Sequence, residues 1–322
     1  MDTCEDTETA IKLIDKHSFD VESLPTKLLS DARVWEHAIS RLPVRMVLTR
    51  LKAMAKRGFL TDPNSSVLEK VLQSIKDPLA LTASKLQPAD ILTIIAQVES
   101  VWEHPPTAAH RVKAGGENYV KIASPHESLL IELNKMMMSS MSNVLKVPCS
   151  VLVCVDCRPC IKRGCWGVWS LKVVRAISLT ILALVKGGAD LTLTTLGEDR
   201  VMQQLQVNNT DTVDTLANRL ENVRGAVLDP ALLMRWARES NKKADLVMCM
   251  TSSHQEVDRK GLVTELELYR NTVFNVKHIY MALASKTITP PVAVQSDPNM
   301  LDISGWGPDS TRIIQAFAKD AF

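Results

Sequence analysis

The sequence predicts an α + α/β protein, in which a short segment of antiparallel helical repeats precedes a doubly wound domain with a mainly parallel sheet. Three observations predict this class. Apolar residues follow a helical spacing over the first third of the chain, and the pattern then breaks in a stretch rich in Pro and Gly. After it, short β-branched runs alternate with helices. A chain of 322 residues has room for two domains of about 150 residues each.

The first part contains five segments with apolar residues on one helical face, joined by short loops. One segment follows the capping pair Ser30-Asp31, and another has Pro43 in its first turn and Gly58 as its stop. We expect antiparallel helices of a HEAT-like repeat over residues 1–102. The predicted helices centre on residues 11–14, 34–39, 44–55, 67–75 and 91–98.

A linker is expected at residues 103–123, where two Pro and two Gly residues interrupt the helical pattern. From 124 to 322 the predicted elements alternate between helix and strand, which favours βαβ crossovers. The predicted helices lie at 125–137, 170–185, 213–223, 230–239, 265–270 and 311–317. The predicted strands lie at 150–155, 191–195 and 245–251, with another inside 273–283.

The composition excludes several functional classes. A net charge of +2 creates no strong global attraction to nucleic acid or membrane. The aromatic content of 4% argues against a sheet that stacks several bases. The start of the chain, Met1–Asp6, resembles neither a signal nor a transit peptide, and the longest apolar run, Ala176–Val185, is too short to span a membrane. Seven cysteines without a secretory start predict reduced thiols in the cytoplasm or nucleus.

Several short motifs resemble the C-terminal part of the Ro autoantigen family, whose TROVE-module proteins bind RNA and carry a von Willebrand factor A domain. The tail Ser296–Gly305 is the most specific of them. The others are Val34-Trp35-Glu36, Leu42-Pro43, Leu86–Leu92, Met234-Arg235-Trp236-Ala237 and Ala244-Asp245-Leu246-Val247. The resemblance implies a ribonucleoprotein whose ring of helical repeats binds small noncoding Y RNAs on its outside and takes the single-stranded ends of misfolded RNAs into its hole. It implies no covalent chemistry.

The helical part is shorter than such a ring requires. It spans residues 1–102, and the resemblance places Met1 in the middle of the family's helical array. We therefore expect the C-terminal portion of the family layout, as a natural short form or a piece of a longer chain. Such a portion is not expected to close a ring alone.

The resemblance also implies a Mg²⁺ site at the C-terminal edge of the sheet, formed by Asp-x-Ser-x-Ser, a Thr and a second Asp. Here Asp156 is kept. The other positions hold Arg158, Cys160, Leu228 (beside Asp229) and Ser252. Mg²⁺ prefers hard oxygen ligands, and a guanidinium two residues from Asp156 can pair with it instead. The sequence therefore predicts a degenerate metal site and no cofactor.

Four cysteines, Cys154, Cys157, Cys160 and Cys165, follow one another closely. Their spacing is similar to that of zinc or iron–sulfur ligands. However, Cys154 lies inside a predicted strand, and buried Cys behaves as a small hydrophobe. We favour core and loop cysteines, and a thiol or metal sensor stays as a weaker alternative.

Basic residues gather between Ile39 and Leu60, a stretch without any acidic residue. They are Arg41, Arg45, Arg50, Lys52, Lys56 and Arg57. Arg41, Arg45, Lys52 and Lys56 recur on one helical face, which can follow a phosphate backbone or be a plain solvated surface. Arg111, Lys113 and Lys121 in the linker could extend this track.

No enzyme is expected. The seven histidines show no HExxH spacing, Ser252-Ser253-His254 lacks a G-x-S-x-G elbow, and no P-loop is present. The preferred function is binding of a small structured noncoding RNA. The alternative is a protein-interaction module that uses the loops Asp156–Cys165 and Ser252–Glu256 of a metal-free A-type domain.

Overall fold

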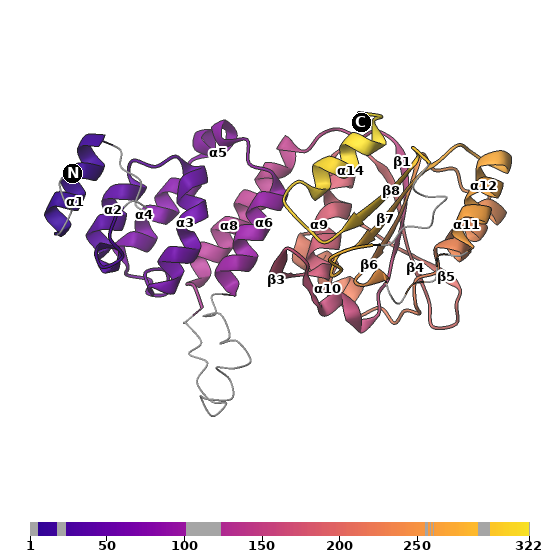
Figure 1. Cartoon of the computed structure of the whole chain (residues 1–322), viewed down its shortest axis with the longest axis horizontal. Helices are drawn as coiled ribbons and strands as arrows, with labels where there is room; N and C mark the ends of the chain where they lie inside the picture. Colours follow the sequence, from indigo (N-terminus) through magenta and orange to yellow (C-terminus); the bar gives the residue numbers. More distant parts are fainter. Residues whose placement is uncertain are drawn as a thin grey trace, which may run out of the picture. The chain divides into compact units, whose positions relative to one another are not determined.

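The protein consists of two compact units, Met1–Asn143 and Val144–Phe322, both drawn in Figure 1. The computed structural model describes residues 6–17, 24–100, 124–254, 257, 259, 261–288 and 297–321. The first unit is helical and the second is a sheet with helices, which confirms the predicted fold class. The predicted linker at 103–123 lies outside the described residues.

The helical unit contains all five helices that the sequence predicts before the linker. Its helices are α1 (Thr7–His17), α2 (Ala32–Ile39), α3 (Val44–Lys56), α4 (Ser66–Lys76), α5 (Pro78–Ser84), α6 (Pro88–Glu99) and α8 (Glu127–Ser139). Helix α1 packs on α2, α2 on α4, and α3 on both α4 and α6. The sequence analysis missed α5, whose Leu79 is 80% exposed and which therefore has no apolar face to detect.

Local signals set the ends of these helices as expected. Asp31 caps α2 by accepting a hydrogen bond from the Arg33 amide. Pro43 precedes the first residue of α3, and Gly58 follows its end with a φ of 79°. A positive φ favours glycine, so the chain leaves the helix there. One face of α3 is buried and the other carries the basic side chains.

Helix α8 belongs to the helical unit, which corrects the predicted domain start at residue 124. Its apolar side chains, including Leu133 and Met137, are buried, and α8 packs on α4 and α6. Asn143 at the end of this unit donates a hydrogen bond of 2.9 Å to the Leu86 carbonyl. The helical unit therefore continues to Asn143, and the second unit starts at Val144, about 20 residues later than predicted.

The second unit is built on a six-stranded sheet with the order β5-β4-β1-β6-β7-β8. All neighbouring strands are parallel except β5, which is antiparallel to β4. The strands are β1 (Ser150–Val155), β4 (Asp190–Leu196), β5 (Met202–Leu205), β6 (Leu246–Thr251), β7 (Lys277–Ala282) and β8 (Met300–Ser304). The short strands β5 and β8 were not predicted.

Helices cover both faces of this sheet (Figure 1). One group packs together as α9 (Val173–Lys186), α10 (Val213–Glu221) and α14 (Ser310–Ala318), and the other consists of α11 (Pro230–Glu239) and α12 (Leu262–Thr272). The predicted helix at 170–185 begins later, because residues 168–172 form strand β3 (Val168–Lys172). This strand pairs with β2 (Gly164–Cys165) in a small hairpin.

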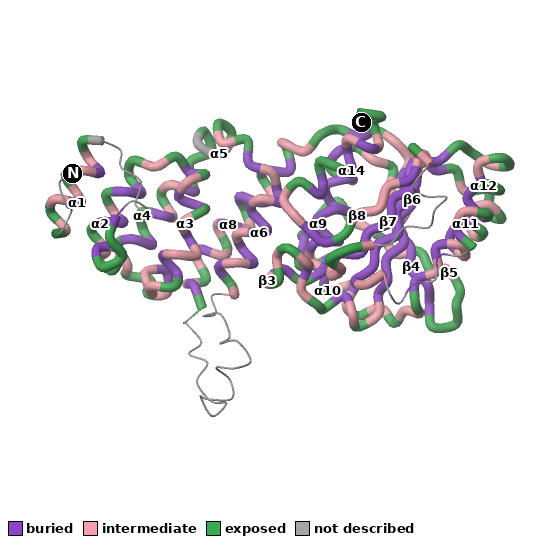
Figure 2. Tube along the Cα trace, in the orientation of Figure 1, coloured by how far each residue is buried: buried purple, intermediate pink, exposed green. Residues whose placement is uncertain are grey.

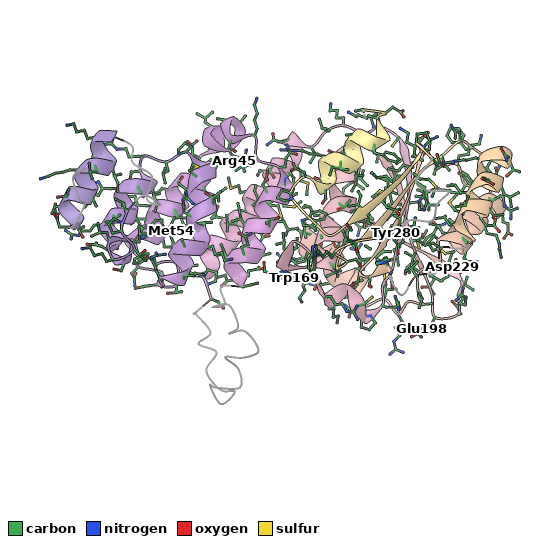
Figure 3. All side chains as sticks on the ribbon, viewed as in Figure 1. Arg45, Met54, Trp169, Glu198, Asp229 and Tyr280 are labelled. Carbon is green, nitrogen blue, oxygen red and sulfur yellow. The ribbon has the colours of Figure 1, made fainter. Side chains whose placement is uncertain are left out.

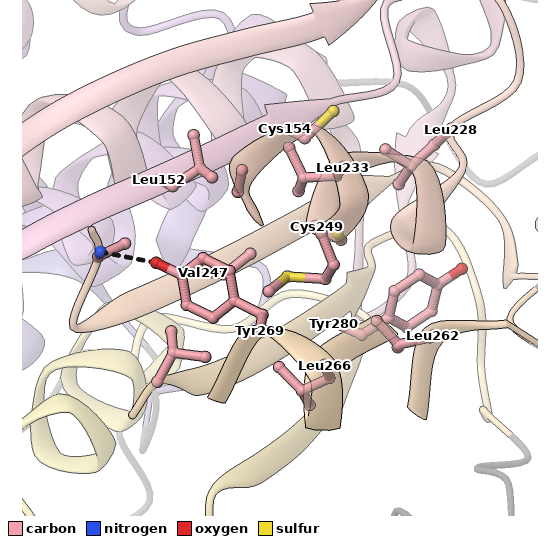
Figure 4. Packing of buried hydrophobic residues seen from close by; sticks show 14 of the residues in the cluster. Leu152, Cys154, Leu228, Leu233, Val247, Cys249, Leu262, Leu266, Tyr269 and Tyr280 are labelled. Atoms are coloured by element: carbon pink, nitrogen blue, oxygen red, sulfur yellow. Dashed lines mark hydrogen bonds between the residues drawn. The ribbon is translucent and has the colours of Figure 1, made fainter. Parts of the chain in front are cut away.

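Apolar residues from the sheet and from α11 and α12 form one core cluster (Figure 4). It includes Cys154 of β1, Cys249 of β6 and Tyr269 of α12. The Tyr269 hydroxyl accepts a hydrogen bond of 3.1 Å from the Ala244 amide and donates one of 2.6 Å to the Lys242 carbonyl. The central strands β6 and β7 are buried along most of their length (Figure 2), as expected for a parallel sheet covered on both faces.

None of the helices in the described ranges is long and apolar enough to cross a lipid bilayer.

His278 is a buried polar side chain in the middle of this sheet. It lies in β7 and is fully buried. Neither ring nitrogen has a hydrogen-bond partner among the described residues. Burial, together with the positive charges of Arg259 and Arg270, lowers its pKa from 6.5 to about 3. The folded protein therefore holds this histidine neutral over the physiological pH range.

We predict that His278 makes folding sensitive to acid. Its pKa is about 3 in the folded state and 6.5 as a model value, so the unfolded chain takes up the proton first as the pH falls. The contribution of the neutral His278 to the free energy of unfolding is fully present above pH 6.5. It decreases by up to about 1.4 kcal/mol for each pH unit below that value. Urea unfolding of His278→Leu between pH 7 and 4.5 should show a smaller loss of stability than the parent protein. An unchanged slope in His278→Leu would contradict the prediction.

Candidate functional site

The register of the parallel strands brings the end of β6 beside the residue that follows β1, at the C-terminal edge of the sheet. Asp156 follows β1, and its amide donates a hydrogen bond of 2.9 Å to the Met250 carbonyl of β6. This pairing places the Asp156 side chain beside Thr251, whose hydroxyl donates to Oδ2 over 2.9 Å. The Asp156 side chain is completely buried. It occupies the position at which ligands bind open α/β sheets.

Arg158 forms the predicted ion pair with Asp156. Its Nε donates to Oδ1 over 2.9 Å and its Nη2 donates to Oδ2 over 2.7 Å. The Arg158 amide adds a longer hydrogen bond of 3.3 Å to Oδ1. With the Thr251 hydroxyl, every oxygen of the carboxylate has at least one donor. The bidentate guanidinium thus neutralises a buried charge in the geometry that Arg is best suited to provide.

The residues at this edge do not fit a Mg²⁺ site. Leu228 is apolar and buried in the core cluster, and Ser252 is buried and carries no charge. Cys160 lies in a short helical turn, Pro159–Lys162, and offers a soft sulfur ligand. Asp229, beside Leu228, caps α11 through the Leu232 amide and pairs with Arg200 over 2.8 Å. Mg²⁺ prefers hard oxygen ligands, and both oxygens of Asp156 already accept hydrogen bonds from Arg158.

The cysteines do not come together as a ligand set. Cys154 points into the core cluster on the α11 side of the sheet, and Cys157 and Cys165 are also buried. Burial raises the pKa of the Cys157 thiol to about 12 and that of Cys165 well above its ordinary value. Metal binding requires thiolates. No group of three or more His, Cys, Asp or Glu within the described ranges could hold a metal ion.

The six predicted basic residues separate into a pair and a group of four. Arg41 lies just after α2, and its guanidinium is 3.3 Å from a carboxylate oxygen of Asp15, so part of its charge is compensated. Arg45 is exposed in the first turn of α3, and Figure 3 labels it at the opposite end of this helix from Met54. The other four residues lie together further along α3 and at its end.

These four residues line a groove of about 400 Å³ on the helical unit, which we call the α3 groove. Its basic side chains are Arg50, Lys52, Lys56 and Arg57. The remaining lining residues are Leu24, Thr26, Leu29, Trp35, Thr49 and Ala53. No acidic side chain is among the described residues that line it. Thr49 and Ala53 are short, and they leave space between the long basic side chains for a ligand.

The wall of the α3 groove is fixed by packing and hydrogen bonds. Trp35 is 1% exposed, and its Nε1 donates a hydrogen bond of 2.8 Å to the Leu29 carbonyl. The Arg57 guanidinium lies 5.8 Å from the centre of the Trp35 ring, within the range of cation–π attraction. Arg57 also donates to the Ala53 carbonyl over 2.9 Å. The sequence analysis found the basic residues but missed this wall, since nothing local links Trp35 to α3.

The comparisons with known proteins agree with this architecture. The model of the Ro60 von Willebrand factor A domain family matches residues 150–318, more than half of the chain. Among solved structures, the crystal structure of the Ro (RSR) protein of Deinococcus radiodurans is similar with a TM-score of 0.81 and 19% sequence identity. That alignment covers 98% of this chain and 60% of the Deinococcus chain. At this identity the structural similarity shows the fold alone.

We predict that the Arg158 side chain stabilises the second unit mainly through Asp156. In Arg158→Ala a buried carboxylate keeps only the Thr251 hydroxyl as its side-chain donor, so the free energy of unfolding should fall by about 2 kcal/mol at pH 7. Denaturant unfolding measures this value. Adding Asp156→Asn to Arg158→Ala removes the unpaired charge and should recover part of the loss. A loss below about 0.5 kcal/mol in Arg158→Ala, the usual size of a surface effect, would contradict the role of the pair.

Proposed function

We propose, from the premise that the chain belongs to the family of proteins with a Ro60 von Willebrand factor A domain, that it binds structured noncoding RNA through the α3 groove. The observation that carries the proposal is the gathering of Arg50, Lys52, Lys56 and Arg57 around one groove whose described lining holds no acidic side chain. Small Y-type RNAs and misfolded structured RNAs are the ligands that the resemblance to the Ro family implies.

The charges of the α3 groove suit a phosphate backbone. Lysine and arginine side chains that line a common surface neutralise successive phosphates and release their counterions. Arg45 lies one helical turn before Thr49 on the same face of α3, so it can extend the contact along the helix. We propose that the contact covers several phosphates in total and contributes most of the affinity.

The buried aromatic ring of the α3 groove favours a folded RNA over an unpaired one at this place. Trp35 is 1% exposed and its indole nitrogen is already hydrogen-bonded, so it offers no face on which a base could stack. Double-stranded RNA is recognised mainly by shape and by contacts to phosphate and 2′-hydroxyl groups. A groove with basic side chains and no accessible ring fits this form of recognition.

A second candidate function is protein interaction through the A-type domain. The observation that favours it is the Asp156–Arg158 pair, which leaves the C-terminal edge of the sheet without the free carboxylate that a metal site needs. A partner would then contact the loops at this edge directly. Arg158 would have a structural role in this case, and RNA would not bind the helical unit.

We predict that reversing two charges in the α3 groove weakens RNA binding. Lys52→Glu with Lys56→Glu should lower the affinity for a structured small RNA by tenfold or more and reduce the salt dependence by about two phosphate contacts. An electrophoretic shift across a salt series measures both. The matched control is Lys70→Glu with Lys76→Glu on α4, which changes the net charge equally on exposed residues outside the groove. Equal losses in both variants would indicate non-specific attraction, and no binding of the parent protein at low salt would leave protein interaction as the function.

We also predict that the A-type domain does not depend on Mg²⁺. Calorimetric titration of the full chain should show no binding at micromolar affinity, because Arg158 donates to both oxygens of Asp156. Thermal unfolding should be the same with millimolar Mg²⁺ and with EDTA. Saturable binding that is lost in Asp156→Asn would show that the site is functional and would reject the prediction.

A further inference from the structure

The α3 groove gathers four basic side chains, and no acidic side chain is among the described residues that line it. Arg50, Lys52 and Arg57 are partly buried there, and Lys56 is exposed. Neither Lys52 nor Lys56 forms an ion pair with another described residue. A cleft lined by charges of one sign concentrates ions of the opposite sign. The groove therefore favours binding of an anion.

Two short side chains lie between the basic ones. Thr49 and Ala53 are one turn apart, outside the buried face of α3. The helix turns by about 100° per residue, which places the basic side chains on both sides of this pair. They are Arg50 with Arg57 on one side and Lys52 with Lys56 on the other. The four basic positions span only about 10 Å along the helix axis, so a small anion over Thr49 and Ala53 can be contacted from both sides.

The volume of the α3 groove favours a small ligand. It is about 400 Å³, within the range of about 300 to 1,000 Å³ that is usual for small-molecule pockets. An RNA duplex is far wider than such a cavity, so it contacts the rim without filling the interior. Trp35, at the wall, is 1% exposed and offers no face to an aromatic ring. The interior is therefore suited to a compact charged group and not to a base.

We propose that the α3 groove binds a free small molecule with three linked phosphate groups, such as a nucleoside triphosphate, and that this ligand competes with RNA. A triphosphate carries about four negative charges at neutral pH, which matches the four basic side chains that line the groove. A monophosphate, with about two charges at most, leaves half of them uncompensated. The Thr26 hydroxyl, which also lines the groove, can donate a hydrogen bond to a phosphate oxygen. The competition rests on the function proposed above, whereas the binding itself does not.

An acidic peptide fits the α3 groove less well than a triphosphate. Four carboxylates require four acidic residues, and an extended chain advances about 3.3 Å for each of them. Every residue also adds backbone atoms that carry no charge. A triphosphate brings the same charge into a smaller volume, which is what a groove of about 400 Å³ can enclose.

Calorimetric titration of the full chain with inorganic tripolyphosphate and with ATP, at low salt and without RNA, tests the binding. Both should bind with a dissociation constant of about 10 to 100 µM, and AMP should bind about tenfold more weakly because it carries less charge. Lys52→Gln with Lys56→Gln should weaken tripolyphosphate binding about tenfold or more. Ala53→Leu narrows the groove without a change of charge and should also weaken it about tenfold.

Matched controls separate the groove from general electrostatic attraction. Lys70→Gln with Lys76→Gln removes two exposed charges on α4, and Ala83→Leu enlarges an exposed side chain on α5. Both controls should bind tripolyphosphate as the parent does. Thermal unfolding checks that each variant is folded.

A second experiment addresses the competition. ATP should displace a bound small structured RNA from the parent protein, whereas AMP at the same concentration should not. If the RNA does not bind at all, the function proposed above fails, and the titration without RNA still decides on the small ligand. ATP binding without displacement of the RNA would overturn the competition.

Three results would overturn the binding itself. The first is the absence of saturable tripolyphosphate binding at millimolar concentration. The second is an equal loss of affinity in the α3 and α4 lysine variants, which would indicate non-specific attraction. The third is tighter binding of oligoglutamate than of tripolyphosphate, which would assign the groove to an acidic peptide.

Discussion

The parallel pairing of β1 with β6, and of β6, β7 and β8 in turn, determines what the second unit presents at its surface. Parallel strands end at the same edge, and burial on both faces fixes their register. Asp156, just after β1, therefore lies beside Thr251, the last residue of β6. The same constraint brings the chain after β7 and after β8 to Trp166. The positions of the ion pair and of the β2–β3 tryptophan hairpin thus both depend on strand register.

At this edge the domain supplies its own cation. A carboxylate as deeply buried as Asp156 is costly unless it is paired and hydrogen-bonded. A metal ion is one solution, and the Arg158 guanidinium, two residues away, is another. Leu228 and Cys160, at positions where the resemblance implies Mg²⁺ ligands, are apolar and sulfur-containing. In this chain the Arg158 guanidinium therefore compensates the charge of Asp156.

The sequence predicts those features that depend on neighbours along the chain. Helix ends at Asp31, Pro43 and Gly58, and the pairing of Asp156 with Arg158, follow from residues a few positions apart. Features that depend on distant residues were missed. Strand β8 carries Asp302, whose partner Arg259 comes from a loop more than forty residues earlier. The charge of Asp302 interrupts the apolar pattern by which a buried strand is predicted from sequence. Four of the six basic residues do line one groove, but Trp35 behind them and Asp15 beside Arg41 come from other helices.

Aromatic residues are scarce in this chain, at 4%, and their burial differs between the two units. In the helical unit Trp35 is part of the core beneath the α3 groove, so that surface can interact only through charge and shape. In the second unit Trp169 remains accessible while its backbone is fixed by the hairpin. Low aromatic content excludes a sheet of several stacking rings. Composition therefore limits the number of aromatic rings, whereas burial decides which of them remain accessible.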